Sequence, residues 1–149
     1  KSGKLSEQEW ELIQKHPVIG AGILREIKQM QDIVPGVLCH HERVDGKGYP
    51  NGLSGQQLPL IGKIVALADS FDAMTSKRTY RDARSVKEAI EEIERNLGTQ
   101  FDEKIGRAFL DSDVYRLWDM IQKYPGRVYC YDDSSTVRYG ADAIGALIR

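Results

Sequence analysis

The sequence predicts an all-α domain that ends in a short β-hairpin. Two capping boxes, Ser6 with Glu9 and Ser85 with Glu88, are typical helix starts, and apolar residues follow them at helical spacing. Runs of β-prone residues are found near the C-terminus. A chain of 149 residues is long enough for one hydrophobic core and one domain.

The first three predicted helices lead to the adjacent histidines. The helix that begins at Ser6 should stop near His16, because the residue before a proline resists helical dihedral angles. Pro17 then begins a second helix. The core face expected for this second helix consists of Val18, Ala21, Gly22, Ile23 and Ile27. A third helix is predicted from Val34 to Glu42 and carries His40 and His41.

A glycine-rich loop separates these helices from the next one. Residues 45–55 contain four glycines and Pro50, which suit turns and close backbone approach. Pro59 then opens a strongly apolar helix from Leu60 to about Thr75. The loop is therefore held between two helices that both carry candidate site residues.

The remaining helices have clear start and stop signals. Ser85 begins a helix that Gly98 stops, and Asp102 caps the next one. Helical spacing then continues to about Lys123.

The C-terminal segment has a different character. Arg127–Tyr131 and Thr136–Tyr139 are predicted to form a β-hairpin around a turn at 132–135. A short final helix is expected from Ala141 to Ile148.

The composition excludes several classes of protein. The net charge of −1 favours neither nucleic acid nor an anionic membrane, so no DNA or RNA partner is expected. No apolar run approaches the ~20 residues of a membrane span, and no secretory signal is present. Cys39 and Cys130 lack metal or disulfide spacing, and Cys39 is expected in the core. We expect a cytoplasmic domain, and Lys1, which is not an initiator Met, predicts a portion of a longer protein.

Three histidines and one aspartate are candidate metal ligands. His16, His40 and His41 are all the histidines of the chain. Imidazoles and carboxylates in one small domain suggest a metal cluster, and such clusters cleave phosphate esters. Asp69 follows Val65 by one helical turn, so it is expected on an apolar stripe, where a buried carboxylate needs a cation or strong donors.

Each of these residues also has a role that needs no metal. Asp69 could form a buried salt bridge or cap a neighbouring helix. His40 and His41 could be one buried and one exposed histidine; as helical neighbours they would diverge by ~100°, which suits two metals better than one. A protonated His16 at the end of a helix would interact favourably with the helix dipole.

Cationic and aromatic residues nearby offer contacts for a phosphate ligand. Arg78 and Arg81 could pair bidentately with phosphate, or they could belong to a solvated surface run with Lys77 and Arg84. Tyr49 in the glycine loop could stack on a base, close a pocket or pack on the surface.

Several longer motifs occur in order along the chain. They are Gly3-Lys4-Leu5-Ser6, Lys15-His16-Pro17, His40-His41-Glu42-Arg43, Asp45-Gly46-Lys47-Gly48-Tyr49-Pro50, Ala68-Asp69-Ser70-Phe71-Asp72-Ala73-Met74-Thr75-Ser76, Arg78, Tyr80-Arg81 and Gly98-Thr99-Gln100-Phe101-Asp102. Together they resemble the HD-GYP family, an all-α subset of the HD metal-dependent phosphohydrolases. The resemblance covers residues 1–111 as the C-terminal portion of an HD-GYP-type helical domain, and it leaves residues 112–149 as a C-terminal extension.

The resemblance implies an activity and a set of site residues. The activity is hydrolysis of the bacterial second messenger cyclic di-GMP at a bi- or trinuclear site of iron, manganese or a similar metal. By motif, the metal ligands would be His16, His40, His41 and Asp69. Arg78 and Arg81 would hold the substrate phosphates, and Gly48, Tyr49 and Pro50 would form a signature loop that contacts substrate or partner.

One departure from the family leaves the function open. The family's His-Asp pair precedes a segment like Gly3-Lys4-Leu5-Ser6, so we expect the metal site to be incomplete in this chain. The chain is then either part of a cyclic di-GMP phosphodiesterase or a catalytically silent regulatory module that contacts partners such as diguanylate-cyclase (GGDEF) domains. A structural fragment without a ligand is the third alternative. Apolar surface left uncovered predicts a homo-oligomer or a tail folded over the gap.

Overall fold

The computed structural model describes residues 5–77 and 82–123, together with the backbone of two strands near the C-terminus. The helices are α1 (Glu7–Ile13), α2 (His16–Arg25), α3 (Val34–Cys39), α4 (Leu60–Thr75), α5 (Val86–Arg95), α6 (Glu103–Leu110) and α7 (Val114–Lys123). Short 3-10 helices occur at η1 (Lys28–Ile33) and η2 (Gly55–Gln57). The chain divides into two compact units, Lys1–Ser112 and Asp113–Arg149. Over the described residues, no helix has the length and hydropathy needed to cross a membrane.

The predicted helix starts are confirmed. Ser6 and Ser85 each form a full capping box, in which the serine hydroxyl accepts the amide hydrogen of a glutamate three residues on. Asp102 caps α6 in the same way, because its carboxylate accepts from the Ile105 amide. The apolar helix after Pro59 has the predicted bounds, Leu60–Thr75.

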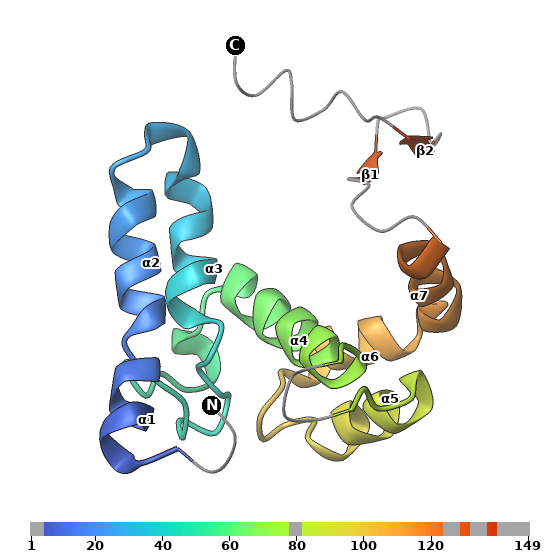
Figure 1. Cartoon of the computed structure of the whole chain (residues 1–149), viewed down its shortest axis with the longest axis horizontal. Helices are drawn as coiled ribbons and strands as arrows, with labels where there is room; N and C mark the ends of the chain where they lie inside the picture. The colour runs from blue at the N-terminus through green and yellow to red at the C-terminus, as the bar shows by residue number, and fades with distance from the viewer. Residues whose placement is uncertain (1–4, 78–81, 124–128, 132–136, 140–149) are drawn as a thin grey trace. The chain divides into compact units, whose positions relative to one another are not determined.

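The first unit is a layered packing of short helices. Helices α2 and α3 lie side by side, α3 packs against α4, and α4 packs against α5 and α6 (Figure 1). The most buried apolar side chains of this unit are Pro17, Ala21, Ala89, Ile93 and Phe101. Cys39 is also buried, as predicted. Helix α4 is therefore the central element, with α3 packed on one part of it and the α5–α6 pair on another.

Helix α2 buries a different face from the predicted one. Pro17 and Ala21 are buried, whereas Val18 and Ile23 are more than half exposed. The small side chain of Ala21 permits close approach of α3, and Gly20 also faces that helix, since a Cβ atom there would lie 3.2 Å from Val37. The larger apolar side chains of α2 consequently lie on the opposite, open face.

Helix α3 is shorter than predicted. It ends at Cys39, so the prediction of a helix through Glu42 is wrong by three residues. The His41 carbonyl accepts a hydrogen bond from the Tyr49 amide at 3.1 Å instead of from a helical amide. Because the glycine loop folds back and takes this acceptor, His40 becomes the C-cap and His41 lies beyond the helix.

A salt bridge connects α4 to the start of α6. The Lys63 ammonium group lies 2.9 Å from the Asp102 carboxylate, and both side chains are largely buried. The Asp102 pKa is lowered, first by the hydrogen bond from Lys63. The N-cap of α6 therefore also fixes the position of the helix relative to α4.

The second unit contains α7 and a strand pair. Asp113 caps α7 by accepting the Arg116 amide at 3.0 Å. Strands β1 (Tyr129–Tyr131) and β2 (Val137–Tyr139) pair antiparallel with Tyr129 opposite Tyr139, which confirms the predicted hairpin strands. The turn at 132–135 and the helix predicted at 141–148 lie outside the described residues.

Two helical glycines provide a matched test of this packing. A Cβ atom at Gly62 would lie 2.8 Å from the Cβ of Cys39, whereas a Cβ at Gly22 would meet nothing within 4 Å. We expect Gly62→Ala to lower the free energy of unfolding by about 1–3 kcal/mol through overpacking. Gly22→Ala should raise it by about 0.5–1 kcal/mol, because alanine is the better helix former. Urea denaturation measures both, and equal effects would contradict the close approach of α3 and α4.

Candidate metal centre

The three histidines come together at the junction of α2 and α3. His16 is the first residue of α2, His40 caps α3, and His41 follows it. The ring centroids of His16 lie 5.2 Å from His40 and 4.9 Å from His41, and those of His40 and His41 are 4.1 Å apart. One ligand atom from each residue lies within 4.8 Å of the others. Ligand atoms this close together could hold one metal ion.

Hydrogen bonds to carbonyl groups fix the orientation of two of the rings. The Nδ1 of His16 lies 2.7 Å from the Ile13 carbonyl, and the Nδ1 of His40 lies 2.6 Å from the Val37 carbonyl. Because a carbonyl can only accept, Nδ1 must be the donor in each ring. In the neutral rings this leaves the lone pair on Nε2, and the two Nε2 atoms face each other at 3.1 Å.

This arrangement fits a metal ion. Imidazole nitrogens bind such metals at ~2.0–2.1 Å, which puts two nitrogens on one ion ~2.8–3.4 Å apart for angles between octahedral and tetrahedral. The observed 3.1 Å separation of the His16 and His40 Nε2 atoms lies in this interval. An Nδ1–H donated to a carbonyl is also the usual outer contact of a metal-binding histidine.

The alternative roles of the histidines match the structure only in part. His16 is the first residue of α2, yet its Nδ1 donates to the carbonyl of Ile13 at the end of α1, so the predicted contact with a helix C-terminus is present. His40 and His41 are both half-buried, so they are not one buried and one exposed residue. They also do not diverge as helical neighbours would, because α3 ends before them.

His41 is held in a neutral state by its surroundings. Partial burial is the main cause that lowers the pKa of His41 to about 4, with further lowering from His40 and His16. The Asp69 charge opposes this shift. The ring of Tyr49 stacks on His41 at 4.7 Å, and burial raises the pKa of its phenol. A neutral imidazole keeps a lone pair available for a metal at neutral pH.

Asp69 lies near the histidines but is not buried. Its side chain is exposed, and it makes no hydrogen bond or ion pair with another described residue. The expectation of a buried carboxylate is therefore wrong, and so is the alternative of a buried salt bridge. The buried residues Leu67 and Phe71 each lie two positions away, which is the opposite side of α4. Its charge still acts on His41 and Tyr49, so it faces the same region.

A buried carboxylate anchors the glycine loop. Glu42 is only 3% exposed, and its two oxygens accept the amides of Asn51 at 2.7 Å and Leu53 at 3.0 Å. Gly48 passes so close to the end of α3 that a Cβ atom there would lie 2.5 Å from the His41 carbonyl oxygen. These contacts hold the Tyr49 ring against His41.

A polar network supports the loop from the opposite side. The Arg43 guanidinium pairs with Asp45 at 2.7 Å and donates to the Gln100 side chain at 3.1 Å. This pairing, through the hydrogen bond from Arg43, is the main cause that lowers the pKa of Asp45 to about 2. Gln100 in turn donates to the Ser70 hydroxyl at 3.5 Å, next to Asp69. The connection between α5 and α6 therefore joins the loop to α4.

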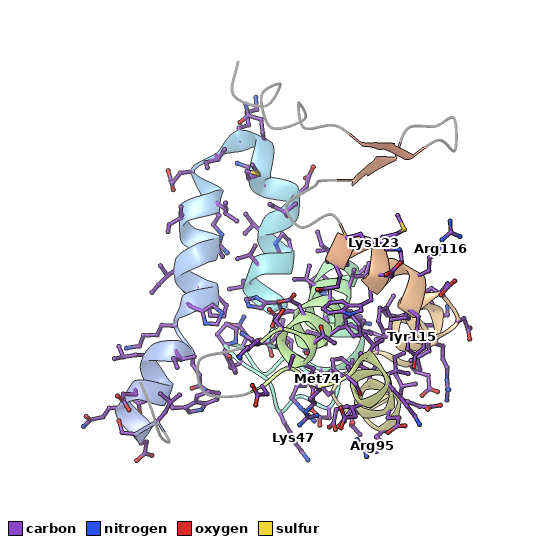
Figure 2. The ribbon with its side chains drawn as sticks, turned by 45° about the vertical axis from the view of Figure 1, so that its right-hand side comes forward. Lys47, Met74, Arg95, Tyr115, Arg116 and Lys123 are labelled. Carbon is purple, nitrogen blue, oxygen red and sulfur yellow. The ribbon has the colours of Figure 1, made fainter. Side chains whose placement is uncertain are left out.

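His40 and His41 open into a cavity of about 470 Å³, which we call the site cavity. Its lining includes Trp10, Gln14, His40, His41, Lys47 and Tyr49. The Lys47 side chain extends outward from the loop (Figure 2) and forms no ion pair with another described residue. The cavity is thus lined by imidazoles and aromatic rings, with the cation of Lys47 at its rim.

The predicted substrate residues are only partly described. Arg78 and Arg81 lie outside the described residues. Lys77 and Arg84 form exposed pairs with Asp82 and Glu92, as the surface alternative expects.

The signature loop lines two cavities. Gly48 lines the site cavity, and Pro50, which follows a cis peptide bond, lines a neighbouring cavity of about 310 Å³. Tyr49 lines both cavities.

The sequence alone assigned no site role to several residues that line the site cavity. Among them are Trp10, Gln14, Glu42, Lys47 and Gln100. A signal was present for the first two, which are four residues apart on a helix that ends just before His16. Glu42 and Gln100 could not be found in this way, because their partners lie far along the chain.

Comparison with known proteins agrees with this geometry. A family model described as "HD domain" matches residues 1–105. A cyclic di-GMP phosphodiesterase of Thermotoga maritima is 42% identical over 123 residues, which are 78% of this chain and 33% of that protein. A 3'3'-cGAMP-specific phosphodiesterase of Vibrio cholerae is 41% identical over 113 residues, 74% of this chain and 22% of that protein.

Two solved structures have the same fold. The chain matches a cyclic GMP-AMP-specific phosphodiesterase of V. cholerae with a TM-score of 0.56 and 25% identity, covering 84% of this chain and 32% of that one. It matches an HDG"Y"P protein of Bdellovibrio bacteriovorus with a TM-score of 0.57 and 20% identity, covering 72% and 34%. The chain belongs to the HD domain family, in its HD-GYP branch. It spans about a third or less of the curated relatives named above.

Substitution of Glu42 tests the loop anchor. In Glu42→Gln one carboxylate oxygen becomes an NH₂ group, which faces a loop amide that also donates. We expect the free energy of unfolding to fall by about 2 kcal/mol, because a buried donor loses its acceptor. The same change at the exposed Glu11 of α1 should stay within about 0.5 kcal/mol. Equal stabilities of the two variants in chemical denaturation would show that Glu42 does not anchor the loop.

Proposed function

We propose that this chain supplies histidine ligands and the signature loop of a metal-dependent phosphodiesterase that hydrolyses cyclic di-GMP. The observation that carries the proposal is the pair of Nε2 atoms of His16 and His40, 3.1 Å apart, with both Nδ1 atoms bonded to carbonyl groups. Relatives that align with about three quarters of the chain are named as phosphodiesterases of cyclic dinucleotides.

The residues of the chain have separate tasks in this proposal. His16, His40 and His41 hold metal through neutral ring nitrogens, and Asp69 adds a carboxylate from the facing side of α4. When bound, such metals lower the pKa of water and stabilise charge on phosphoryl oxygens. Arg78 and Arg81 bind the substrate phosphates, and Lys47 at the cavity rim attracts them.

The metal site is proposed to be bi- or trinuclear, with iron or manganese as the metal. A mixed set of imidazole and carboxylate ligands suits these metals better than a thiolate site would. The chain spans about a third of the T. maritima relative, so we propose that further ligands come from outside these 149 residues.

The partners and location are proposed on the same basis. The loop of Gly48, Tyr49 and Pro50 is the proposed contact for a GGDEF domain. The buried free thiol of Cys39 agrees with a cytoplasmic location.

A second candidate function is a catalytically silent interaction module, possessing the fold without turnover. It is favoured by one observation, the exposed apolar surface of α1 and α2. This surface includes Leu12, Val18, Ile19 and Ile23, each more than half exposed. Such a surface suits contact with a protein partner or with a second copy of the chain. Turnover by the full-length protein would exclude the silent alternative.

Two aspartates of α4 provide the test of the metal ligands. Asp69 and Asp72 are both exposed and lie one turn apart, but Asp72 accepts a hydrogen bond from Ser76. In the full-length protein with Mn²⁺ or Fe²⁺, we expect Asp69→Asn to lower turnover of cyclic di-GMP by more than the ~10–100-fold typical of outer-shell partners. Asp72→Asn should retain nearly full activity. Bound metal, measured by mass spectrometry, should fall in the Asp69 variant alone.

Two results would count against the proposal. Unchanged metal content and turnover in Asp69→Asn and in His16→Ala would remove both residues from the metal site. A wild-type protein that binds metal but does not hydrolyse cyclic di-GMP would favour the silent module.

A further inference from the structure

Trp10 and Gln14 form a pair of side chains on one face of α1. They are four residues apart, and both line the site cavity. Trp10 is 46% exposed although it is a large aromatic residue, and Gln14 is half-buried. The side-chain amide of Gln14 makes no hydrogen bond with another described residue. The cavity therefore presents an open aromatic ring beside an unused donor and acceptor.

The position of this pair relative to the histidines is set by Tyr49. The Trp10 ring meets the Tyr49 ring edge-on at 6.0 Å, with the planes at 76°. Tyr49 also stacks on His41, with the ring centroids 4.7 Å apart and the planes at 29°. Because His41 covers one face of Tyr49, the accessible aromatic surface of the cavity belongs largely to Trp10. A ligand with its phosphate at the histidines can reach this ring within the length of one nucleotide.

The chemistry of the pair matches a purine base. Aromatic rings stack on bases, and side-chain amides read base edges through paired hydrogen bonds. The Gln14 amide offers one donor and one acceptor. It can accept from the adenine amino group while donating to the adjacent ring nitrogen. After rotation by half a turn, it can accept from guanine N1–H while donating to O6.

We infer that Trp10 and Gln14 form a purine subsite of the site cavity that accepts guanine and adenine alike. The inference deepens the proposed function and rests on it, because the phosphate end of the nucleotide is taken to lie at the histidines. The relatives differ in the substrate that their names give, which is cyclic di-GMP for one and 3'3'-cGAMP for another. By this account, the amide of Gln14 makes the present site tolerant of both bases.

A charge change at Gln14 should convert tolerance into selectivity. In Gln14→Glu the side chain keeps its length but can only accept. A carboxylate accepts from both N1–H and the N2 amino group of guanine, whereas adenine offers a ring nitrogen that it repels. Gln8→Glu is the matched control, because Gln8 lies on the same helix, is exposed and makes the same change of charge.

The experiment measures binding by isothermal titration calorimetry with the full-length, metal-loaded protein. The probes are GMP, AMP and ribose 5-phosphate, which has no base. The wild type should bind GMP and AMP with similar affinity and ribose 5-phosphate more weakly. Trp10→Ala should weaken both nucleotides about tenfold and leave ribose 5-phosphate unchanged, because base stacking is lost. Gln14→Glu should favour GMP over AMP by at least about tenfold, and Gln8→Glu should not.

Other outcomes overturn the inference, and they are separable from failure of the proposed function. Any of three results would remove the subsite. The wild type binds GMP and ribose 5-phosphate equally, or it binds neither nucleotide, or the Trp10→Ala and Gln14→Glu variants keep wild-type affinities. Circular dichroism and the melting temperature verify that the variants fold. A protein that hydrolyses cyclic di-GMP without dependence on Trp10 keeps the proposed function and loses the subsite. Base-dependent binding without hydrolysis would support the subsite and refute the proposed phosphodiesterase activity.

Discussion

Closure of the glycine loop against the histidines depends on the buried carboxylate of Glu42. This carboxylate is buried directly after the two adjacent histidines, and it accepts the amides of Asn51 and Leu53 from the returning side of the glycine loop. A buried carboxylate without donors would cost several kcal/mol, so the loop must close over it for the domain to fold. Loop closure then stacks Tyr49 on His41 and so forms the wall of the site cavity.

The same closure explains why the histidines can share a metal. A longer α3 would have directed His40 and His41 to different sides of a helix. Instead, the loop takes the carbonyl of His41, α3 ends, and both rings turn toward His16. The lowered pKa of His41 keeps that ring neutral beside the other two. The carbonyl bonds at Nδ1 fix the orientation of the His16 and His40 rings and direct their Nε2 atoms toward each other.

Much of the fold follows from local signals, and the site follows only in part. Ser6, Ser85 and Asp102 act within four residues of themselves, which is why the helix starts could be predicted. The end of α3 could not, because it depends on a contact with the distant Tyr49. The exposure of Asp69 was also missed, since apolar spacing alone does not show which side of α4 meets its neighbours.

The metal itself is the most direct test of this account. Crystals of the full-length protein grown with Mn²⁺ would reveal the ion through its anomalous scattering. The account predicts a peak bound by the Nε2 atoms of His16 and His40, with His41 and Asp69 at the same cluster. The loop of Tyr49 should remain closed on Glu42. The account would be contradicted if the protein hydrolyses cyclic di-GMP and binds Mn²⁺ elsewhere, with none of the three histidines bound to the ion.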